Sequence, residues 1–158
     1  HVSLLKSSNE WRSNRSANFS KAEDQAARIS QEGMEILRDI RKSNPTNIRD
    51  GGIPHDWNWL YTQTFPVPPG PDEAVLENCS GEICLNLQEG SGETVTIDSR
   101  TFTRRVFIQD SYSVNSNECN LPVGGDQDSI KLYRVDVTWD DTSGSHTTTT
   151  SSCLRREV

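Results

Sequence analysis

Apolar and small residues recur in steps of three and four through the N-terminal quarter of the chain, which predicts one buried face of an α-helix. The pattern is regular from Ser20 onward, and Asn44-Pro45 ends the predicted helix. Upstream of Phe19 the apolar positions thin out, so a long helix from about Leu4 and a frayed N-terminal extension both stay open. The expected buried positions are Ala26, Ile29, Gly33, Ile36, Leu37 and Ile40.

Gly33 lies on this predicted buried face, in the middle of the helix. Glycine costs a helix about 1 kcal/mol relative to alanine. Such a cost is usually tolerated where another part of the chain must come close to the helix backbone. We therefore expect a close approach between helix and sheet at this position.

From Thr94 onward the pattern changes to that of β-strands. The segments "TVTID", "TFTRRVFIQDSYS", "SIKLYRVDVTW" and "SHTTTTSSC" are rich in β-branched and aromatic residues. The third segment alternates cleanly and predicts an inward-facing row made of Tyr133, Val135, Val137 and Trp139. These strands indicate an antiparallel sheet with one dry face, for which the amphipathic helix is the cover.

Residues 45–93 form the connection between these two regions and contain the turn signals "DGGIP", "FPVPPGPD" and "EGSGE". We expect a long irregular loop, a feature that is often functional. Four aromatic residues interrupt it, and three alternatives stay open: they anchor the loop to the core, form a short strand, or provide a surface for a partner. They are Trp57, Trp59, Tyr61 and Phe65.

The predicted fold class is therefore α+β, with one long N-terminal helix packed on an antiparallel sheet. We expect a single domain over residues 1–158. Its parts are the helix (1–44), the loop region (45–93), and the sheet with the C-terminal region (94–158).

The four cysteines of the chain indicate disulfides and an oxidising compartment, because their number is even and metal-ligand spacing is lacking. Four cysteines allow three pairings. We favour Cys79–Cys84, which closes a small loop, and Cys119–Cys153, which ties down the C-terminus and is the larger clamp.

Composition narrows the function classes. Only 32% of the residues are hydrophobic and 25% are charged, so the core is modest and the surface polar. The net charge of −7 argues against a nucleic-acid partner, which would require a basic patch. No stretch approaches the roughly 18 apolar residues of a membrane span.

For catalysis the sequence offers no recognised motif, and His55 and His146 stand in loop or edge contexts. We expect no catalytic residue, no enzyme activity and no obligatory cofactor. A weak calcium site is conceivable through carboxylate oxygens, although the spacing is not that of an EF-hand and solvated turn acids are favoured. Its candidate ligands are Asp126, Asp128, Asp140 and Asp141.

Arg104 and Arg105 are neighbours in a predicted strand and therefore lie on opposite faces of the sheet. The inward-facing arginine requires a carboxylate partner. Glu32 and Glu35 of the helix are the candidates.

Three segments together resemble bacterial type IV pilins and pseudopilins. They are residues 26–44, with "QEGMEILRDIR" as the most specific part, residues 102–108 ("FTRRVFI"), and residues 130–150, with "VDVTWDD" followed by "SH". They stand in the order found in that family and bracket most of the chain. The closest likeness is to minor pilins.

The resemblance implies a non-catalytic structural subunit of a type IV pilus or pseudopilus, with other subunits and an inner-membrane assembly machinery as partners. It implies a surface filament as location, and a precursor that is anchored by an apolar half-helix and methylated after processing. Cys119 and Cys153 fall where many pilins have a disulfide-bounded C-terminal region. The apolar half-helix is missing here, and we expect residues 3–44 to continue it. An adhesin that uses the loop aromatics is the alternative.

Overall fold

The computed structural model describes residues 2–43, 46–65, 72–87, 90, 92–113, 116–120 and 129–156. Its elements in chain order are α1 (Val2–Ser43), β1 (Ile48–Asp50), β2 (Ile53–His55), the 3-10 helix η1 (Trp57–Thr62), β3 (Asp72–Cys79), β4 (Glu82–Leu87), β5 (Glu93–Ile97), β6 (Arg100–Asp110), β7 (Tyr112–Ser113), β8 (Ser116–Asn117), β9 (Ile130–Asp141) and β10 (Gly144–Arg155).

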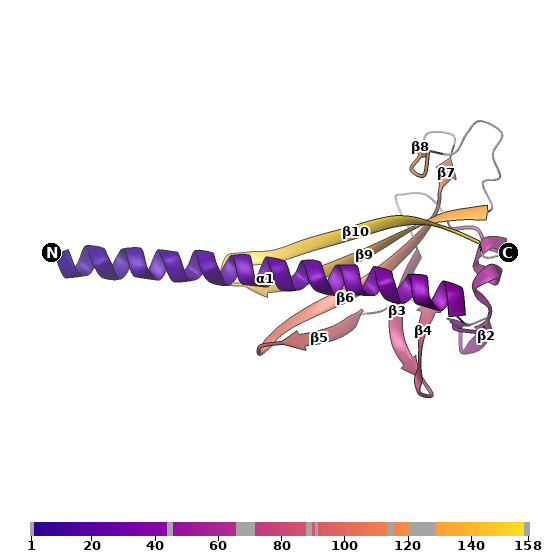
Figure 1. Cartoon of the computed structure of the whole chain (residues 1–158), viewed down its shortest axis with the longest axis horizontal. Coiled ribbons are helices and arrows are strands. Elements are labelled where there is room, and N and C mark those ends of the chain that lie inside the picture. Colours follow the sequence, from indigo (N-terminus) through magenta and orange to yellow (C-terminus); the bar gives the residue numbers. More distant parts are fainter. Residues whose placement is uncertain are drawn as a thin grey trace.

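Helix α1 contains 42 residues, so of the two alternatives the long helix is confirmed. It crosses one face of the sheet with its C-terminal part, and its N-terminal part extends beyond the sheet (Figure 1). Arg41 and Lys42 occupy the last turn, where the helix dipole favours cations.

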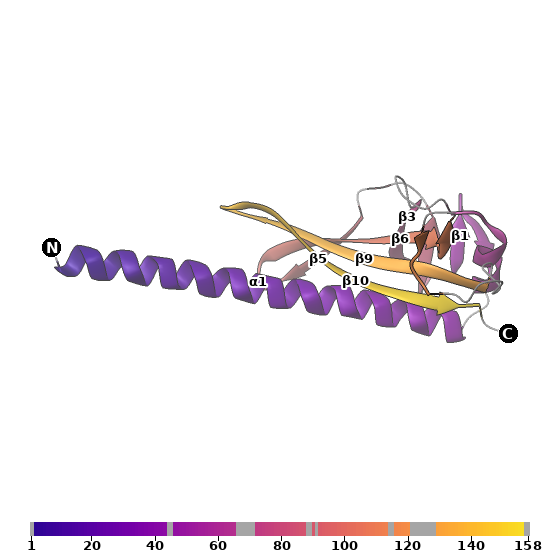
Figure 2. The ribbon, with the colours of Figure 1, turned by 90° about the horizontal axis from the view of Figure 1, so that it is seen from above.

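One eight-stranded sheet carries most of the chain, in the order β10-β9-β6-β3-β4-β1-β2, with β5 paired to β6 beside this path. Strands β10, β9 and β6 run side by side along one side of the helix (Figure 2). All pairs are antiparallel except β1 with β4, where Ile48 stands opposite Leu85. A separate small ribbon joins β7 and β8.

The predicted α+β class, a long helix on an antiparallel sheet with an irregular loop, is wrong. The strands together contain more residues than α1, so the chain is mostly β, and its sheet is mixed. The region 45–93 is not a loop, because it contributes β1 to β4, η1 and the first residue of β5. Of the three turn signals, "DGGIP" is confirmed, because Gly51 and Gly52 have positive φ and form the two-residue turn between β1 and β2. The signals "FPVPPGPD" and "EGSGE" lie in part outside the described residues.

The four predicted strands from Thr94 onward are confirmed as β5, β6, β9 and β10. Their inward-facing row is buried, as are the helix positions opposite it. Ile36 differs, since it is only partly buried, and Met34 takes a core position that was not expected.

The helix and sheet enclose two apolar clusters. The smaller one packs Ala22, Ala26 and Ile29 against Phe102, Val137 and Trp139. The larger one begins at Met34 on the helix and at Val135 on β9, and it extends to η1 and the β1–β4 region. The boundary between them falls at helix residues 30–33.

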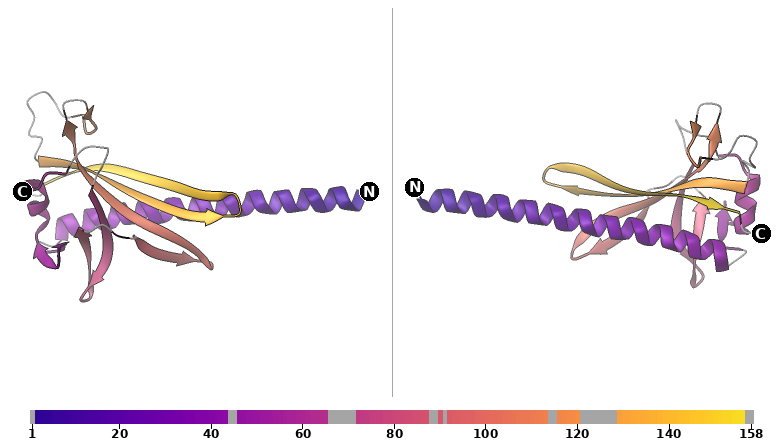
Figure 3. Two further views of the ribbon diagram at one scale, coloured as in Figure 1. Left: turned by 180° about the vertical axis from the view of Figure 1, so that it is seen from behind. Right: turned by 45° about the horizontal axis from the view of Figure 1, so that its top comes forward.

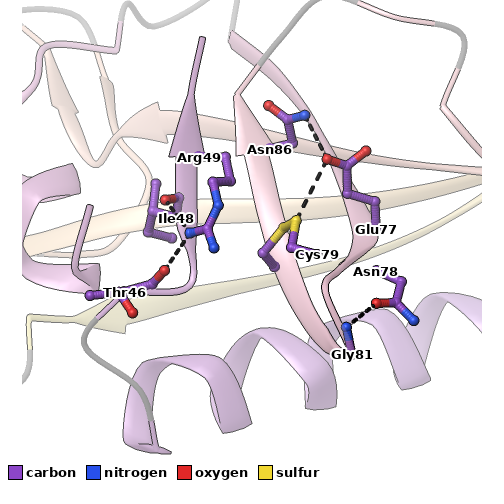
Figure 4. Close-up of a disulfide and its surroundings, with 9 residues drawn as sticks. Thr46, Ile48, Arg49, Glu77, Asn78, Cys79, Gly81 and Asn86 are labelled. Atoms are coloured by element: carbon purple, nitrogen blue, oxygen red, sulfur yellow. Dashed lines mark hydrogen bonds between the residues drawn. A yellow bond between two sulfur atoms is a disulfide. The ribbon is translucent and has the colours of Figure 1, made fainter. Parts of the chain in front are cut away.

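Both predicted disulfides are present. Cys79–Cys84 joins β3 to β4 across their hairpin (Figure 4), where the amide of Asn86 also donates to Glu77 Oε1 over 2.7 Å. Cys119–Cys153 joins the segment after β8 to β10. The second bond therefore attaches the C-terminal strand to a part of the chain outside the main sheet.

Candidate functional site

Gly33 lies against the sheet, as its place on the buried face predicts. A Cβ added at this position would stand 2.9 Å from Val135 Cγ1 and 3.1 Å from Arg104 Cδ. The approach is therefore made by two side chains of the sheet, and a larger residue at position 33 would have to displace them.

Arg104 fills the space that Gly33 leaves and is only 4% exposed. Its guanidinium donates to both carboxylate oxygens of Glu93, over 2.7 and 3.1 Å, and to the carbonyl oxygen of Ile29 over 3.0 Å. The carboxylate of Glu32 lies 3.8 Å away. The expected helix partner is thus present only at longer range.

Glu35, the other candidate, pairs with Arg38 on the same helix. The principal partner, Glu93, was missed because it stands at the end of the region expected to be a loop. Arg104 lies at the boundary between the apolar clusters together with Ser30, whose hydroxyl bonds to Val135 O (2.9 Å) and Thr150 Oγ1 (2.7 Å). These polar bonds fix the position of the helix along the sheet.

The aromatic residues of the 45–65 region are mostly part of the core. Trp57, Tyr61 and Phe65 are at most 4% exposed. The indole of Trp57 donates to the Tyr61 hydroxyl (3.2 Å), which donates to Leu154 O (2.7 Å). They therefore anchor the region and offer no surface to a partner.

Trp59 differs, because it is partly exposed and stacks on His55 with ring centroids 3.8 Å apart. Its place on one turn of η1 follows from the Asp56 cap, whose carboxylate accepts from Trp59 N. Of the four aromatic side chains, Trp59 is therefore the only one that is more than 4% exposed.

Lys131 is buried to 3% exposure beside these aromatics and was not singled out from the sequence. Its ammonium lies 2.6 Å from Asp110 Oδ1 and 3.0 Å from Gln63 O, above the ring of Phe65. It shares the inward phase of Tyr133 and Val135, so extending the alternation by one step would have found it.

Two of the four candidate calcium ligands, Asp126 and Asp128, lie outside the described residues. Asp140 and Asp141 serve the β9–β10 turn: the first accepts a hydrogen bond from Ser145, the second from the amide and hydroxyl of Ser143. The hydrogen bond from Ser143 lowers the pKa of Asp141 well below its usual range. His146 Nε2, which lies 3.0 Å from Asp141 Oδ1, adds to this effect.

Among the described residues, one group with metal-site spacing combines Glu77 with Cys79 and Cys84. Both sulfurs are joined in a disulfide, so neither can act as a thiolate ligand.

The N-terminal part of α1 is the most prominent feature of the surface. Buried contacts with the sheet begin at Ala22, while residues 17–21 are exposed. Phe19 packs edge-on against His146 of β10, near the tip of the β9–β10 hairpin. From there the helix continues past the sheet toward Val2 (Figure 3).

A helix in a protein takes most of its stability from the packing of an apolar face against a neighbour. The sequence of residues 2–18 supplies only sparse large apolar side chains, at Val2, Leu4, Leu5 and Trp11. The projecting helix is therefore the candidate assembly surface.

Comparison with family models, curated proteins and solved structures finds no significant match to this chain. Within the described residues, none of the helices has the length and apolar character needed to cross a membrane.

Proposed function

We propose that the protein is a non-catalytic structural subunit of an extracytoplasmic filament of the type IV pilus or pseudopilus kind, with a minor-subunit role favoured. The observation that carries the proposal is the N-terminal part of α1, which continues beyond the sheet (Figure 1). In the filament this segment packs against the same segment of neighbouring copies.

Two further observations support the proposal. The segment "QEGMEILRDIR", on which the resemblance mostly depends, lies in the part of α1 that packs on the sheet, so it supplies the base from which the free segment projects. The disulfides are typical of proteins outside the reducing cytoplasm. The membrane-anchored precursor and the assembly machinery belong to the same proposal.

The test uses the full-length gene product in its own cells, with single cysteines at Ser8 or Ser16 of the projecting helix. Thr101→Cys, an exposed position on β6, is the matched control. We expect the protein in the filament fraction sheared from the cells. Mild oxidation should then give covalent dimers for Ser8→Cys and Ser16→Cys, because each variant has one free thiol.

The control should stay monomeric under the same oxidation. Absence of the protein from sheared filaments, or equal cross-linking of the control, would contradict the proposal. No binding function is proposed beside it, because three of the four aromatic residues that an adhesin would use are buried.

A further inference from the structure

A groove lies between the C-terminal part of α1 and the start of β4. Ile36 and Ile40 of the helix and Ile83 of the strand give it apolar walls, and Ile83 is 46% exposed. The exposed residues Asp39 and Glu82 also line it. Its volume is about 400 Å³, at the lower end of the range for ligand pockets. The groove is therefore large enough for one bulky side chain, but not for a second helix.

The charge of this groove is negative. Asp39 and Glu82 are acidic, and none of the described residues that line the groove is Lys or Arg. Exposed apolar surface with polar residues around it is typical of protein interaction sites. The chemistry of this groove suits one large apolar side chain with cations beside it.

The projecting segment of α1 supplies that chemistry. Residues 2–18 contain three basic residues and one acidic residue, whereas the whole chain has a net charge of −7. Trp11 is the one aromatic residue of this segment, and Arg12 follows it directly. The spacing of four residues places Trp11 and Arg15 on one side of a helix. Trp and Arg are also the residue types most enriched at the energetic centres of interfaces.

The two complementary surfaces lie toward opposite ends of the molecule. The N-terminus of α1 is far from the β3–β4 hairpin, beside which the groove lies (Figure 1). Trp11 and Ile40 belong to one helix and are about 40 Å apart along it, so a chain cannot fill its own groove. A contact between two different surfaces is heterologous, and its repetition gives an open assembly unless the rotation closes a ring.

We propose that the projecting segment of one copy docks into this groove on the next copy. Trp11 enters between Ile40 and Ile83, and Arg15 lies beside Asp39. Each copy uses both of its ends, so the assembly grows head to tail in one direction. The inference rests on the proposed function and deepens it, because it adds a second contact of the projecting segment to the contact with the same segment of other copies.

The first experiment is analytical ultracentrifugation of the 158-residue chain over a concentration series. We expect association that continues beyond a dimer as the concentration rises. Trp11→Ala removes the anchor and Ile83→Arg puts a cation into the groove, and each should weaken association at least tenfold. Ile53→Arg is the matched control, because Ile53 is a 61% exposed isoleucine that does not line the groove, and it should leave association unchanged.

The second experiment mixes the two defective variants. Trp11→Ala retains the groove, and Ile83→Arg retains the anchor. An equimolar mixture should therefore form a heterodimer that grows no further, at a concentration at which each variant alone is monomeric. Formation of the heterodimer also shows that both variants are folded. A mixture that stays monomeric would overturn the proposal, since a head-to-tail contact requires only one intact surface from each partner.

The third experiment reverses the charges of the proposed ion pair. Arg15→Glu and Asp39→Lys should each weaken association, because like charges then stand side by side. The double variant should recover most of the loss, since it restores opposite charges at the contact. A double variant that associates more weakly than both single variants would overturn the placement of Arg15 beside Asp39.

These measurements separate the docking contact from the filament. A wild-type chain that stays monomeric throughout, or an Ile53→Arg variant as defective as Ile83→Arg, overturns the docking contact even when the protein is present in sheared filaments. Head-to-tail association of a chain that is absent from sheared filaments supports the docking contact and overturns the filament role.

Discussion

Gly33 places the backbone of α1 against two side chains of the sheet, and this packing predicts an unusual response to substitution. Gly33→Ala gains up to about 1 kcal/mol of helix propensity. The new Cβ, however, would stand 2.9 Å from Val135 Cγ1, and overpacking of a core typically costs about 1–3 kcal/mol. We expect a net loss of about 1 kcal/mol in the free energy of unfolding, measured with denaturant.

The matched test for Gly33 is the double variant with Val135→Ala, which removes Val135 Cγ1, the nearest atom to the new Cβ. In that background Gly33→Ala should be neutral or stabilising, which gives a clear coupling in a double-mutant cycle. Additive losses in the two variants would show that the contact is not the cause.

Arg104 and Glu93 form an ion pair in which only the carboxylate reaches solvent, with side-chain exposures of 5% and 29%. Glu93→Gln leaves a buried guanidinium with a weaker partner, and we expect a loss of about 1–3 kcal/mol in the free energy of unfolding. Glu35→Gln breaks the exposed pair with Arg38 and should cost less than about 1 kcal/mol. Equal losses in the two variants would contradict this ranking.

The positions of individual side chains could be predicted from the sequence only where the hydrophobic pattern was regular. It placed Gly33 and the inward row of β9 correctly, because a period of 3.6 or 2 fixes which side chains share a face. It did not identify the pairing of Arg104 with Glu93 or of Lys131 with Asp110, since each pair joins two different strands and has no local signal. Arg104 shows the limit: its need for a carboxylate was predicted, but the wrong residue was favoured.

At the scale of elements, the two disulfides constrain unequal lengths of chain, with sequence separations of 34 for Cys119–Cys153 and 5 for Cys79–Cys84. Loop-closure entropy predicts stabilisation of about 4 kcal/mol for the first bond and about 2 kcal/mol for the second. Replacing each pair with alanines and measuring the free energy of unfolding checks the order. A greater loss from the short loop would contradict the entropic account.

The elements that were predicted correctly are those long enough to show a hydrophobic pattern within their own residues. Strands β6, β9 and β10 have 11 or 12 residues each, long enough for alternation to be recognised. Strands β1 and β2 have three residues each and are flanked by glycine and proline signals. The parallel pairing of β1 with β4 joins segments far apart in the chain, so no local window contains it.

At the scale of the whole molecule, the fold class was mispredicted because the region 45–93 was read by its turns alone. Its strands extend the sheet past β6 and make the chain mostly β. For the projecting helix, the sequence left two alternatives open, because the apolar positions thin out upstream of Phe19, and the structure shows the long helix. In the proposed function this surface is completed by other subunits, and the sequence of one chain does not identify them.

Tyr133 makes the stability of the whole fold depend on pH, because it is fully buried in the larger cluster and stacks against Trp57. Burial raises the pKa of its hydroxyl well above 10.0, and the neighbouring Tyr61 adds to the rise. Unfolding exposes this hydroxyl, so above about pH 10 the unfolded chain ionises it while the native chain keeps the proton. Stability should therefore be unaffected by this group below pH 10 and fall as the pH rises further.

Denaturant titrations between about pH 8 and pH 11 measure this dependence. Tyr133→Phe loses the 3.4 Å hydrogen bond to Tyr61 and should be less stable at pH 8. Its stability should nevertheless decline less steeply at alkaline pH than that of the wild type, because the group whose ionisation favours the unfolded chain is gone. Parallel decline of the two proteins would show that Tyr133 does not govern alkaline unfolding.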